Sequence, residues 1–309
     1  MVSGAAAQFM MKSRAESTIR GYDPSWMRFS QFCLERSESA LPASPMVVAD
    51  FIAELADIGL SVPTIEKSLA AISFEHKKFF MDSPTLNSGV KLVLEGVRRE
   101  HAKPSRQVKP FTLGVISKAV SLLSSTDSIM VWRTVWRMTV GLFAMLRFSE
   151  VTRISMEHIF FSDDGNMRLY IPRSKTDQRS KGLTKWLPAI DKDYCPVALT
   201  RAYIKKFGLV KGFLQPRSQG RSFTSREAIK YGVARDNLSR VLEMIGEPSE
   251  GYTEHSYKRG GALAALEAGL TTREQMLFGN WASERMVHLY SSQSASLHHD
   301  LVRRVAALQ

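Results

Sequence analysis

Apolar side chains recur every three or four residues through the first hundred positions of the chain, with polar side chains between them. This period is typical of helices that bury one face. It predicts helices over residues 17–35, 46–58, 64–80 and 87–99. We expect their apolar stripes to form a core. The stripe residues are Ile19, Tyr22, Trp26, Phe29, Cys33, Val48, Phe51, Ile52, Leu55, Ile58, Ile65, Leu69, Ile72 and Phe79.

The pattern changes in the rest of the chain. Residues 128–146 are apolar nearly all round, which predicts a buried helix in a larger domain. Residues 167–189 begin with alternating apolar positions, continue through a polar turn and return past Trp186, which predicts a β-hairpin. Helices are expected again from Pro196, from Ala228 and over the last third. The fold class is therefore mainly α with a small β-hairpin or sheet.

A basic segment separates these two regions. Residues 98–109 contain one acid, Glu100, and Pro104 and Pro110 break the segment. An extended linker between two domains and a solvated surface loop both fit this composition. We expect a first domain over residues 1–102, a linker over 103–110 and a second domain over 111–309. The cations of the segment are Arg98, Arg99, Lys103, Arg106 and Lys109.

The charge balance narrows the choice of partner. The 309 residues carry a formal net charge of +12, with a pI near 9.8. This balance favours a polyanion or an anionic surface as partner, with a simply soluble basic protein as the alternative. Cys33 and Cys195 lie far apart in the chain and offer neither a disulfide framework nor a zinc set, which suits a reducing compartment.

The chain shows no sign of a membrane or secretory segment. No apolar run reaches the roughly 18 residues that cross a bilayer, and the N-terminus lacks a signal-peptide core. We therefore expect an intracellular protein without a membrane partner. A nucleus and a bacterial cytoplasm both fit, and mitochondrial import stays open.

Four separated segments carry side chains that suit chemistry on a phosphate. Each has an ordinary structural explanation when taken alone: a charged pair at a helix end could simply pair or cap, and a lone tyrosine on an amphipathic helix usually packs. The segments are MLRFSEV with Arg147 and Glu150, RSKTDQ with Lys175, HSYKRGGA with His255 and Lys258, and GNWASERMVHLY with Trp281 and Tyr290.

In this order and at these spacings the four segments resemble the tyrosine recombinase, or phage integrase, family, with the spacing of its Cre-type members. The resemblance covers essentially the whole chain, loosely in the N-terminal half. It implies a two-domain clamp around DNA, in which a helical N-terminal DNA-binding domain is joined to an α+β tyrosine recombinase catalytic domain. Residues 255–262 also resemble the recombinases of eukaryotic mobile elements.

The resemblance assigns three reacting groups. Cleavage of a phosphodiester without a metal needs a nucleophile, a cationic cradle and an acid for the leaving oxygen. By resemblance, Tyr290 attacks the phosphate and forms a link to the DNA 3′ end. Arg147 would hold the nonbridging oxygens with its planar fork. Lys175 would protonate the departing 5′ oxygen.

Four further residues would support this chemistry. His255 would assist proton transfer near the nucleophile, since its ordinary pKa lies close to the working pH. Trp281 would donate its indole N–H to the phosphate. Glu150 would orient the neighbouring basic groups, and Arg259 stands next to the site in sequence. No carboxylate cluster suggests a two-metal site, so neither a metal nor another cofactor is expected.

The family pattern has a second arginine where this chain has Lys258. A lysine cannot form a bidentate fork, and the lost contact would cost about 2–4 kcal/mol in the transition state, or roughly 10²–10³ in rate. Arg259 is turned about 100° away on a helix. Three interpretations stay open: a tolerated lysine, a weakened enzyme that still binds DNA, or a wrong register. The Gly260–Gly261 pair argues against the last.

The leading hypothesis is a site-specific recombinase or integrase that acts on double-stranded DNA. A catalytically weakened, recombinase-derived DNA-binding protein is the alternative, and a type IB topoisomerase, which shares the chemistry, is a third. DNA contacts are expected from Lys77, Lys78 and the cations of residues 98–109.

The C-terminal segment adds a prediction about assembly. Leu297, Leu301 and Val305 recur at four-residue steps, which indicates a short helix with one apolar stripe. The stripe either packs within its own chain or docks on a neighbouring protomer, as in relatives that form tetramers. A homo-oligomer on DNA, joined through this helix, is therefore expected.

Overall fold

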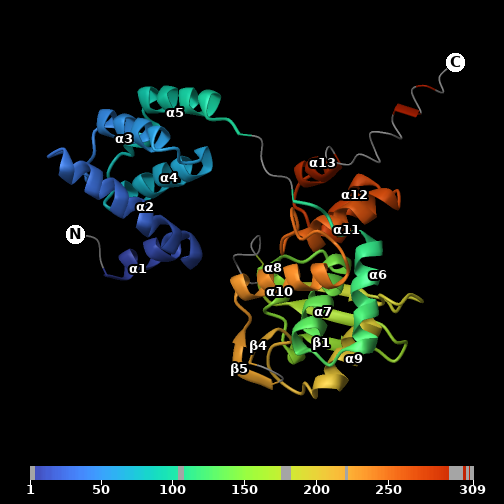
Figure 1. The fold of residues 1–309 in the computed structure, drawn as a ribbon. Coiled ribbons are helices and arrows are strands. Elements are labelled where there is room, and N and C mark those ends of the chain that lie inside the picture. The colour runs from blue at the N-terminus through green and yellow to red at the C-terminus, as the bar shows by residue number, and fades with distance from the viewer. Residues whose placement is uncertain are drawn as a thin grey trace. The chain divides into compact units, whose positions relative to one another are not determined.

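The computed structural model describes residues 4–103, 108–174, 182–219, 222–291, 302–303 and 306. The chain divides into two compact units, Met1–Ser105 and Arg106–Gln309 (Figure 1). Each unit has its own hydrophobic core. None of the helices in the described ranges is long and apolar enough to cross a bilayer.

The N-terminal unit is entirely helical over its described residues, as the sequence predicts. Ser44 and Asn87 cap two of the helices by accepting hydrogen bonds from the backbone N–H groups of Val47 and Gly89. The elements are α1 (Gly4–Lys12), α2 (Glu16–Glu35), α3 (Pro45–Asp57), α4 (Val62–Lys78), the 3-10 helix η1 (Pro84–Leu86) and α5 (Ser88–Glu100).

Phe29, Phe32 and Phe51 pack ring to ring at the centre of this unit. Two residues of the predicted apolar stripes are exposed instead of buried. Ile58 and Phe79 are 62% and 56% exposed. Each is the C-cap, the residue directly after its helix, so the periodic placement that buries the earlier stripe positions no longer applies.

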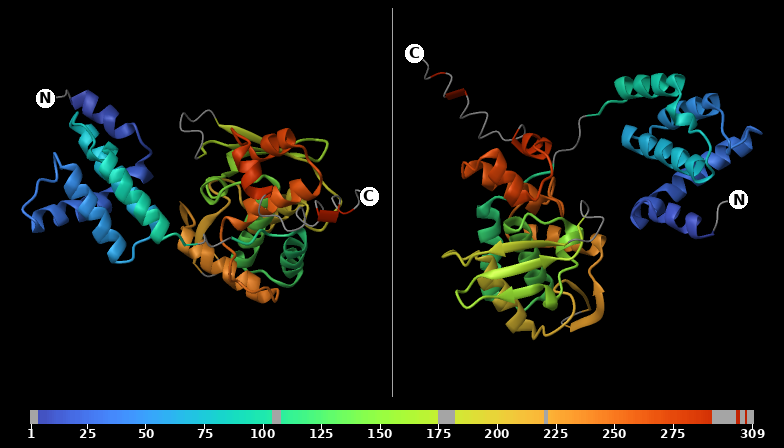
Figure 2. Two further views of the ribbon diagram at one scale, coloured as in Figure 1. Left: turned by 90° about the horizontal axis from the view of Figure 1, so that it is seen from above. Right: turned by 180° about the vertical axis from the view of Figure 1, so that it is seen from behind.

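The C-terminal unit is built around the predicted buried helix, which is confirmed as α7. Helices surround it, and a three-stranded sheet covers one side of the unit (Figure 2). The elements are α6 (Leu113–Ser121), η2 (Leu122–Ser125), α7 (Ile129–Phe143), α8 (Phe148–Val151), η3 (Met156–His158), β1 (Ile159–Phe161), β2 (Met167–Ile171), β3 (Leu183–Leu187), α9 (Pro196–Phe207), β4 (Pro216–Gln219), β5 (Ser222–Ala228), α10 (Tyr231–Met244), α11 (Ser256–Glu267), α12 (Thr272–Gly279) and α13 (Arg285–Ser291).

The predicted hairpin is confirmed as β2 and β3, and β1 extends it into an antiparallel sheet of order β1-β2-β3. A second, two-stranded sheet of β4 and β5 was not predicted. The helix expected from Ala228 begins instead at Tyr231, because Ala228 is the last residue of β5. The apolar pattern there is too short to separate a strand from a helix.

The glycine pair lets α11 approach two backbone segments. A Cβ atom on Gly260 would lie 2.2 Å from the Phe111 carbonyl oxygen, and one on Gly261 would lie 2.4 Å from the Leu142 carbonyl oxygen. Only residues without a side chain fit at such distances. The approach fixes the start of α11, which carries His255, against the end of α7, which leads to Arg147.

Candidate active site

Arg147 and Glu150 lie where the chain leaves α7. The backbone N–H of Arg147 donates to Glu150 Oε2 at 2.7 Å, and its Nη1 donates to Oε1 at 2.8 Å. The carboxylate therefore both caps α8 and pairs with the guanidinium, so both ordinary explanations of this motif hold. Glu150 is buried while Arg147 stays partly exposed. The ion pair thus orients a guanidinium that still reaches solvent.

Tyr290 lies beside His255 and Trp281. Its hydroxyl oxygen is 3.4 Å from His255 Nε2, and its ring stacks on the Trp281 ring with centroids 5.2 Å apart. The Arg259 guanidinium stands 5.7 Å from the centre of the tyrosine ring. Three elements supply these groups: the start of α11, the turn after α12, and α13. The structure thus brings together residues that are 35 positions apart in the chain.

The electrostatics of this cluster set the protonation states of the histidine and the tyrosine. Partial burial of the ring lowers the pKa of His255, and Lys258, Arg259 and Arg147 lower it further. Burial raises the pKa of Tyr290, against the opposing effect of Arg259 and Arg147. The histidine is therefore neutral and the tyrosine protonated near neutral pH, which is the starting state for a general base beside a hydroxyl nucleophile.

The Trp281 indole is buried, with 6% of its surface exposed. Its Nε1 atom has no hydrogen-bond partner among the described residues. A buried donor without a partner is costly, so it is a candidate for contact with a group that binds later.

The residue before His255 is held by a buried ion pair. Arg137, on α7, donates from Nε and Nη2 to the two carboxylate oxygens of Glu254, each at 2.8 Å. Both side chains are 1% exposed. A buried bidentate pair fixes its partners in one geometry, so it sets where α11 begins. No local pattern predicts that Glu254 and Arg137, 117 positions apart, meet.

Lys258 reaches the site from α11 but points into the protein. Its side chain is buried, and its Nζ donates to the Met145 carbonyl at 2.6 Å and to the Gly279 carbonyl at 3.5 Å. Burial lowers its pKa to about 7, with a further lowering from Arg147 and Lys185 and a raising effect from Glu150.

Lys185 is a buried cation that the sequence analysis did not single out. It lies on β3, paired with Leu169 of β2, and its ammonium donates to the Phe278 carbonyl of α12. Burial lowers its pKa to about 8, and Glu150 opposes this. Leu183 and Leu187 flank it on the same face of the strand, so the alternation could have revealed a lysine on an apolar face.

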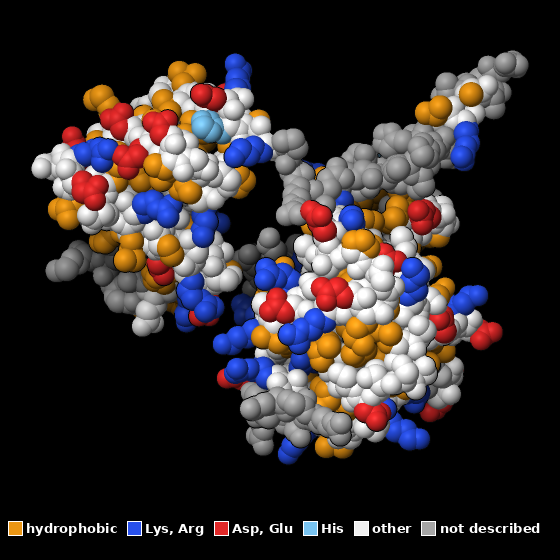
Figure 3. Space-filling model, in the orientation of Figure 1, with side chains coloured by type: hydrophobic (Ala, Val, Ile, Leu, Met, Phe, Trp, Pro, Cys, Tyr) orange, Lys and Arg blue, Asp and Glu red, His pale blue; other side chains and the backbone are white. Residues whose placement is uncertain are grey.

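The remaining predicted residues either lie outside the described residues or are surface cations. Lys175 and Arg106 lie outside the described residues, as do Leu297, Leu301 and Val305. Arg98 pairs with Glu66 and Glu95, and Lys78 pairs with Glu75. Cations and acids are interspersed on the face shown in Figure 3. The predicted cations with mostly exposed side chains are Lys77, Arg99, Lys103 and Lys109.

In the described part of the chain, no group of three or more His, Cys, Asp or Glu side chains lies in a position to hold a metal ion.

No model of a protein family matches the chain. Two characterised proteins do. An integrase/recombinase XerD homologue from Selenomonas ruminantium is 24% identical over 293 residues, which cover 93% of this chain and 85% of the relative. The recombinase Cre of Escherichia phage P1 is 25% identical over 281 residues, which cover 85% of this chain and 80% of the relative.

Solved structures share the fold. The Tn1549 transposon integrase in complex with transposon right-end DNA superposes with a TM-score of 0.66 at 13% identity, covering 97% of this chain and 99% of that one. The XerH site-specific recombinase bound to its difH substrate gives a TM-score of 0.55 at 12% identity, covering 91% and 76%.

The fold and the sequence comparisons indicate the class of protein that this chain is similar to, the DNA recombinases. More particularly, the chain resembles the tyrosine recombinase, or phage integrase, family, since its two relatives are an integrase/recombinase and the recombinase Cre.

Proposed function

We propose that this chain is a site-specific recombinase that cleaves and rejoins double-stranded DNA through a 3′-phosphotyrosyl intermediate on Tyr290. The observation that carries the proposal is the placement of the Tyr290 hydroxyl 3.4 Å from Nε2 of His255, whose pKa is lowered by burial and by nearby cations. The stacking of Trp281 on the tyrosine and the partly exposed Arg147 support the same chemistry.

The reaction is a transesterification. The Tyr290 oxygen forms a bond to phosphorus while the bond from phosphorus to the 5′ oxygen breaks. The tyrosine proton passes to His255, and Lys175 supplies a proton to the leaving oxygen. The new phosphodiester retains the energy of the broken one, so attack by a 5′ hydroxyl reverses the step without a nucleotide cofactor.

Arg147 and Trp281 stabilise the charge that builds up on the phosphate. Arg147 donates to the nonbridging oxygens, where a charge-assisted contact is strongest in a water-poor site. The Trp281 N–H, which has no partner among the residues that the structure describes, donates to the same group. Glu150 holds Arg147 in place through the bond at 2.8 Å.

The test is trapping of the covalent adduct on DNA from the ends of the protein's own locus, nicked near candidate sites. The wild type is expected to form an SDS-resistant adduct, and Tyr290→Phe is expected to form none. Tyr194→Phe is the matched control, since this tyrosine packs on Phe143 away from the site. An adduct that survives in Tyr290→Phe would refute the assignment. Relaxation of supercoiled DNA without strand exchange would indicate a type IB topoisomerase instead.

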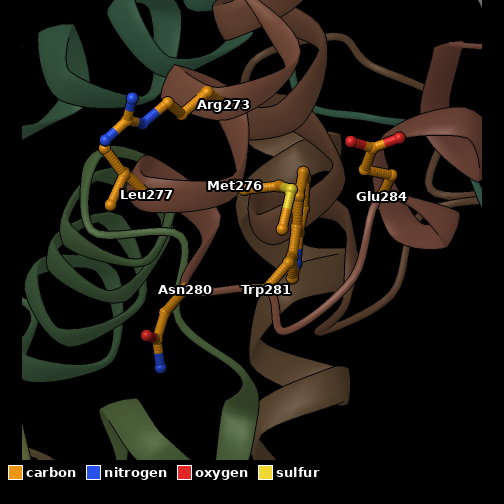
Figure 4. Close-up of a pocket in the computed structure, with 6 residues that line it drawn as sticks. All are labelled: Arg273, Met276, Leu277, Asn280, Trp281 and Glu284. Carbon is orange, nitrogen blue, oxygen red and sulfur yellow. The ribbon is translucent and has the colours of Figure 1, made fainter.

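We also propose that the enzyme assembles as a homo-oligomer through its C-terminal segment. A pocket of about 400 Å³ lies at α12 and the turn toward α13 (Figure 4). Leu277, 72% exposed, borders it, and Met276 lies against the Trp281 ring. The stripe of Leu297, Leu301 and Val305 from a neighbouring protomer would fill this pocket. The lining residues are Arg273, Met276, Leu277, Asn280, Trp281 and Glu284.

A further inference from the structure

The end of α12 is held by two lysines from distant elements. The last carbonyls of a helix have no partner within the helix and favour nearby cations. Lys185 on β3 donates to the Phe278 carbonyl, and Lys258 on α11 donates to the Gly279 carbonyl at 3.5 Å. Their side chains are almost completely buried, with 9% and 2% of the residue surface exposed. The chain then turns through Asn280, with φ of 49°, directly into Trp281.

Lys258 links this turn to a second one. Its shortest bond, 2.6 Å, goes to the Met145 carbonyl. Met145 has φ of 49°, a conformation that non-glycine residues rarely adopt, and Arg147 follows two residues later. A single ammonium therefore bridges the turn that presents Arg147 and the turn that presents Trp281.

We infer that Lys185 and Lys258 are positioning residues that hold the turn after α12 against the turn before α8, and that Lys258 serves this purpose instead of gripping the phosphate. The catalytic consequence rests on the function proposed for Tyr290. The clamp itself is a property of the free protein and is measurable without DNA.

The geometry of the ammonium group explains why lysine suits these two positions better than arginine. An ammonium has three donors in different directions, so it suits two carbonyls that approach from separate segments. A guanidinium presents its donors in one plane and suits a carboxylate or phosphate. Burial lowers the pKa of both lysines, to about 7 for Lys258 and to about 8 for Lys185. Glu150 is the acid that opposes both shifts.

Hydrogen exchange of the full-length protein without DNA tests the clamp. The variants are Lys185→Met and Lys258→Met, which keep an unbranched side chain but no donor. Lys192→Met, at an exposed lysine of the same unit, is the matched control. We expect amide exchange in residues 272–291 to become at least 10-fold faster in both variants and to stay unchanged in the control. Exchange within twofold of the wild type in both variants would overturn the inference.

Protection of α9 and of the N-terminal unit reports whether each variant folds. If a methionine variant loses that protection, glutamine at the same position, which keeps a neutral donor, replaces it in the comparison. With Lys185→Gln or Lys258→Gln we expect exchange in residues 272–291 between that of the wild type and that of the methionine variant. If residues 272–291 of the glutamine variants exchange as slowly as in the wild type, while the rest of the protein stays protected, the result would count against the clamp.

Lys258→Arg separates positioning from phosphate binding. A phosphate contact predicts that the restored fork raises adduct formation by roughly 10²–10³, with unchanged exchange. The clamp predicts no gain in adduct and faster exchange at Trp281, because the planar group does not fit both carbonyls. The Tyr290→Phe variant tests the proposed function separately. If this variant still forms the adduct, the proposed function is wrong, while the hydrogen-exchange result still tests whether the two lysines hold the turn.

Discussion

At the scale of single residues, the contacts of Lys258 explain why a lysine can stand where the family pattern has an arginine. The resemblance to tyrosine recombinases makes it a replacement for an arginine. In the structure its ammonium contacts the Met145 and Gly279 carbonyls, while Arg147 remains partly exposed. Its burial has a measurable consequence for stability.

We predict that Lys258 makes the stability of the protein depend on pH. Its folded pKa of about 7 lies below the ordinary value of 10.5, so between these values the unfolded chain binds more protons. Its contribution is complete above the ordinary pKa and is lost as the pH falls through about 7. Stability should therefore rise by up to about 1.4 kcal/mol per pH unit in this window.

Urea unfolding at pH 7 and pH 9 measures this effect. Lys258→Met should reduce the rise to the part that Lys185 contributes through its own pKa of about 8, and Lys192→Met, at an exposed lysine, should leave the rise intact. Equal pH dependence in the wild type and in Lys258→Met would contradict the prediction.

At the scale of elements, the contact of α11 with α7 positions the site. Gly261 lets α11 approach the Leu142 carbonyl of α7, Gly260 lets it approach the Phe111 carbonyl, and the Arg137–Glu254 pair fixes the residue before His255. The tyrosine side of the site depends on a separate contact, in which Gly279 leaves room for the Trp281 ring, 2.5 Å from where a Cβ atom would stand.

Alanine at Gly260 or Gly261 is expected to destabilise the protein by about 1–3 kcal/mol or more, since the new methyl group meets a backbone carbonyl that has no room to move. Gly232→Ala on α10 is the control. Apart from its chain neighbours and its own helix backbone, no atom of the described residues lies within 4 Å of its Cβ position, so alanine there should stabilise by roughly 0.5–1 kcal/mol. Thermal or urea unfolding compares the three variants. Similar effects at Gly260 and Gly232 would rule out the close-approach argument.

At the scale of the whole molecule, the net charge of +12 should act through phosphate contacts. The logarithm of DNA affinity falls with the logarithm of salt by about 0.9 per contact. The double variant Lys103→Ala and Lys109→Ala should therefore flatten the slope by about 1.8. Lys206→Ala, whose ammonium pairs with Asp127, is the control and should leave the slope unchanged. Fluorescence anisotropy titrations over a range of salt give the slope, and an unaltered slope in the double variant would exclude these two lysines.

Assembly is also a property of the whole molecule. Removal of residues 297–309 should leave the protein monomeric on DNA, and Leu277→Glu in the full chain should do the same by charging the pocket border. Mass photometry of the DNA complexes measures the number of protomers. Leu92→Glu, at an equally exposed leucine of the N-terminal unit, is the control. Intact oligomers in both test variants would place the interface elsewhere.

Much of the architecture follows from local pattern. The helical period predicted α2 to α5 and the all-round apolar run predicted α7, because the side chains of a helix repeat with its turns whatever the helix contacts. Alternation predicted β2 and β3. It failed for β4 and β5, where the pattern is short, and at Ile58 and Phe79, where the helices end. The order and spacing of Arg147, His255, Trp281 and Tyr290 were readable as a motif.

The sequence by itself determined the helical elements, the hairpin, the basic charge and the resemblance to recombinases, since each depends on residues close together in the chain or on composition. The tertiary structure decided what the cations contact. Lys258 meets a carbonyl 113 positions away, and Lys185 meets one 93 positions away. No local period encodes such a pairing, because it arises only when α7, β3, α11 and α12 pack around one another.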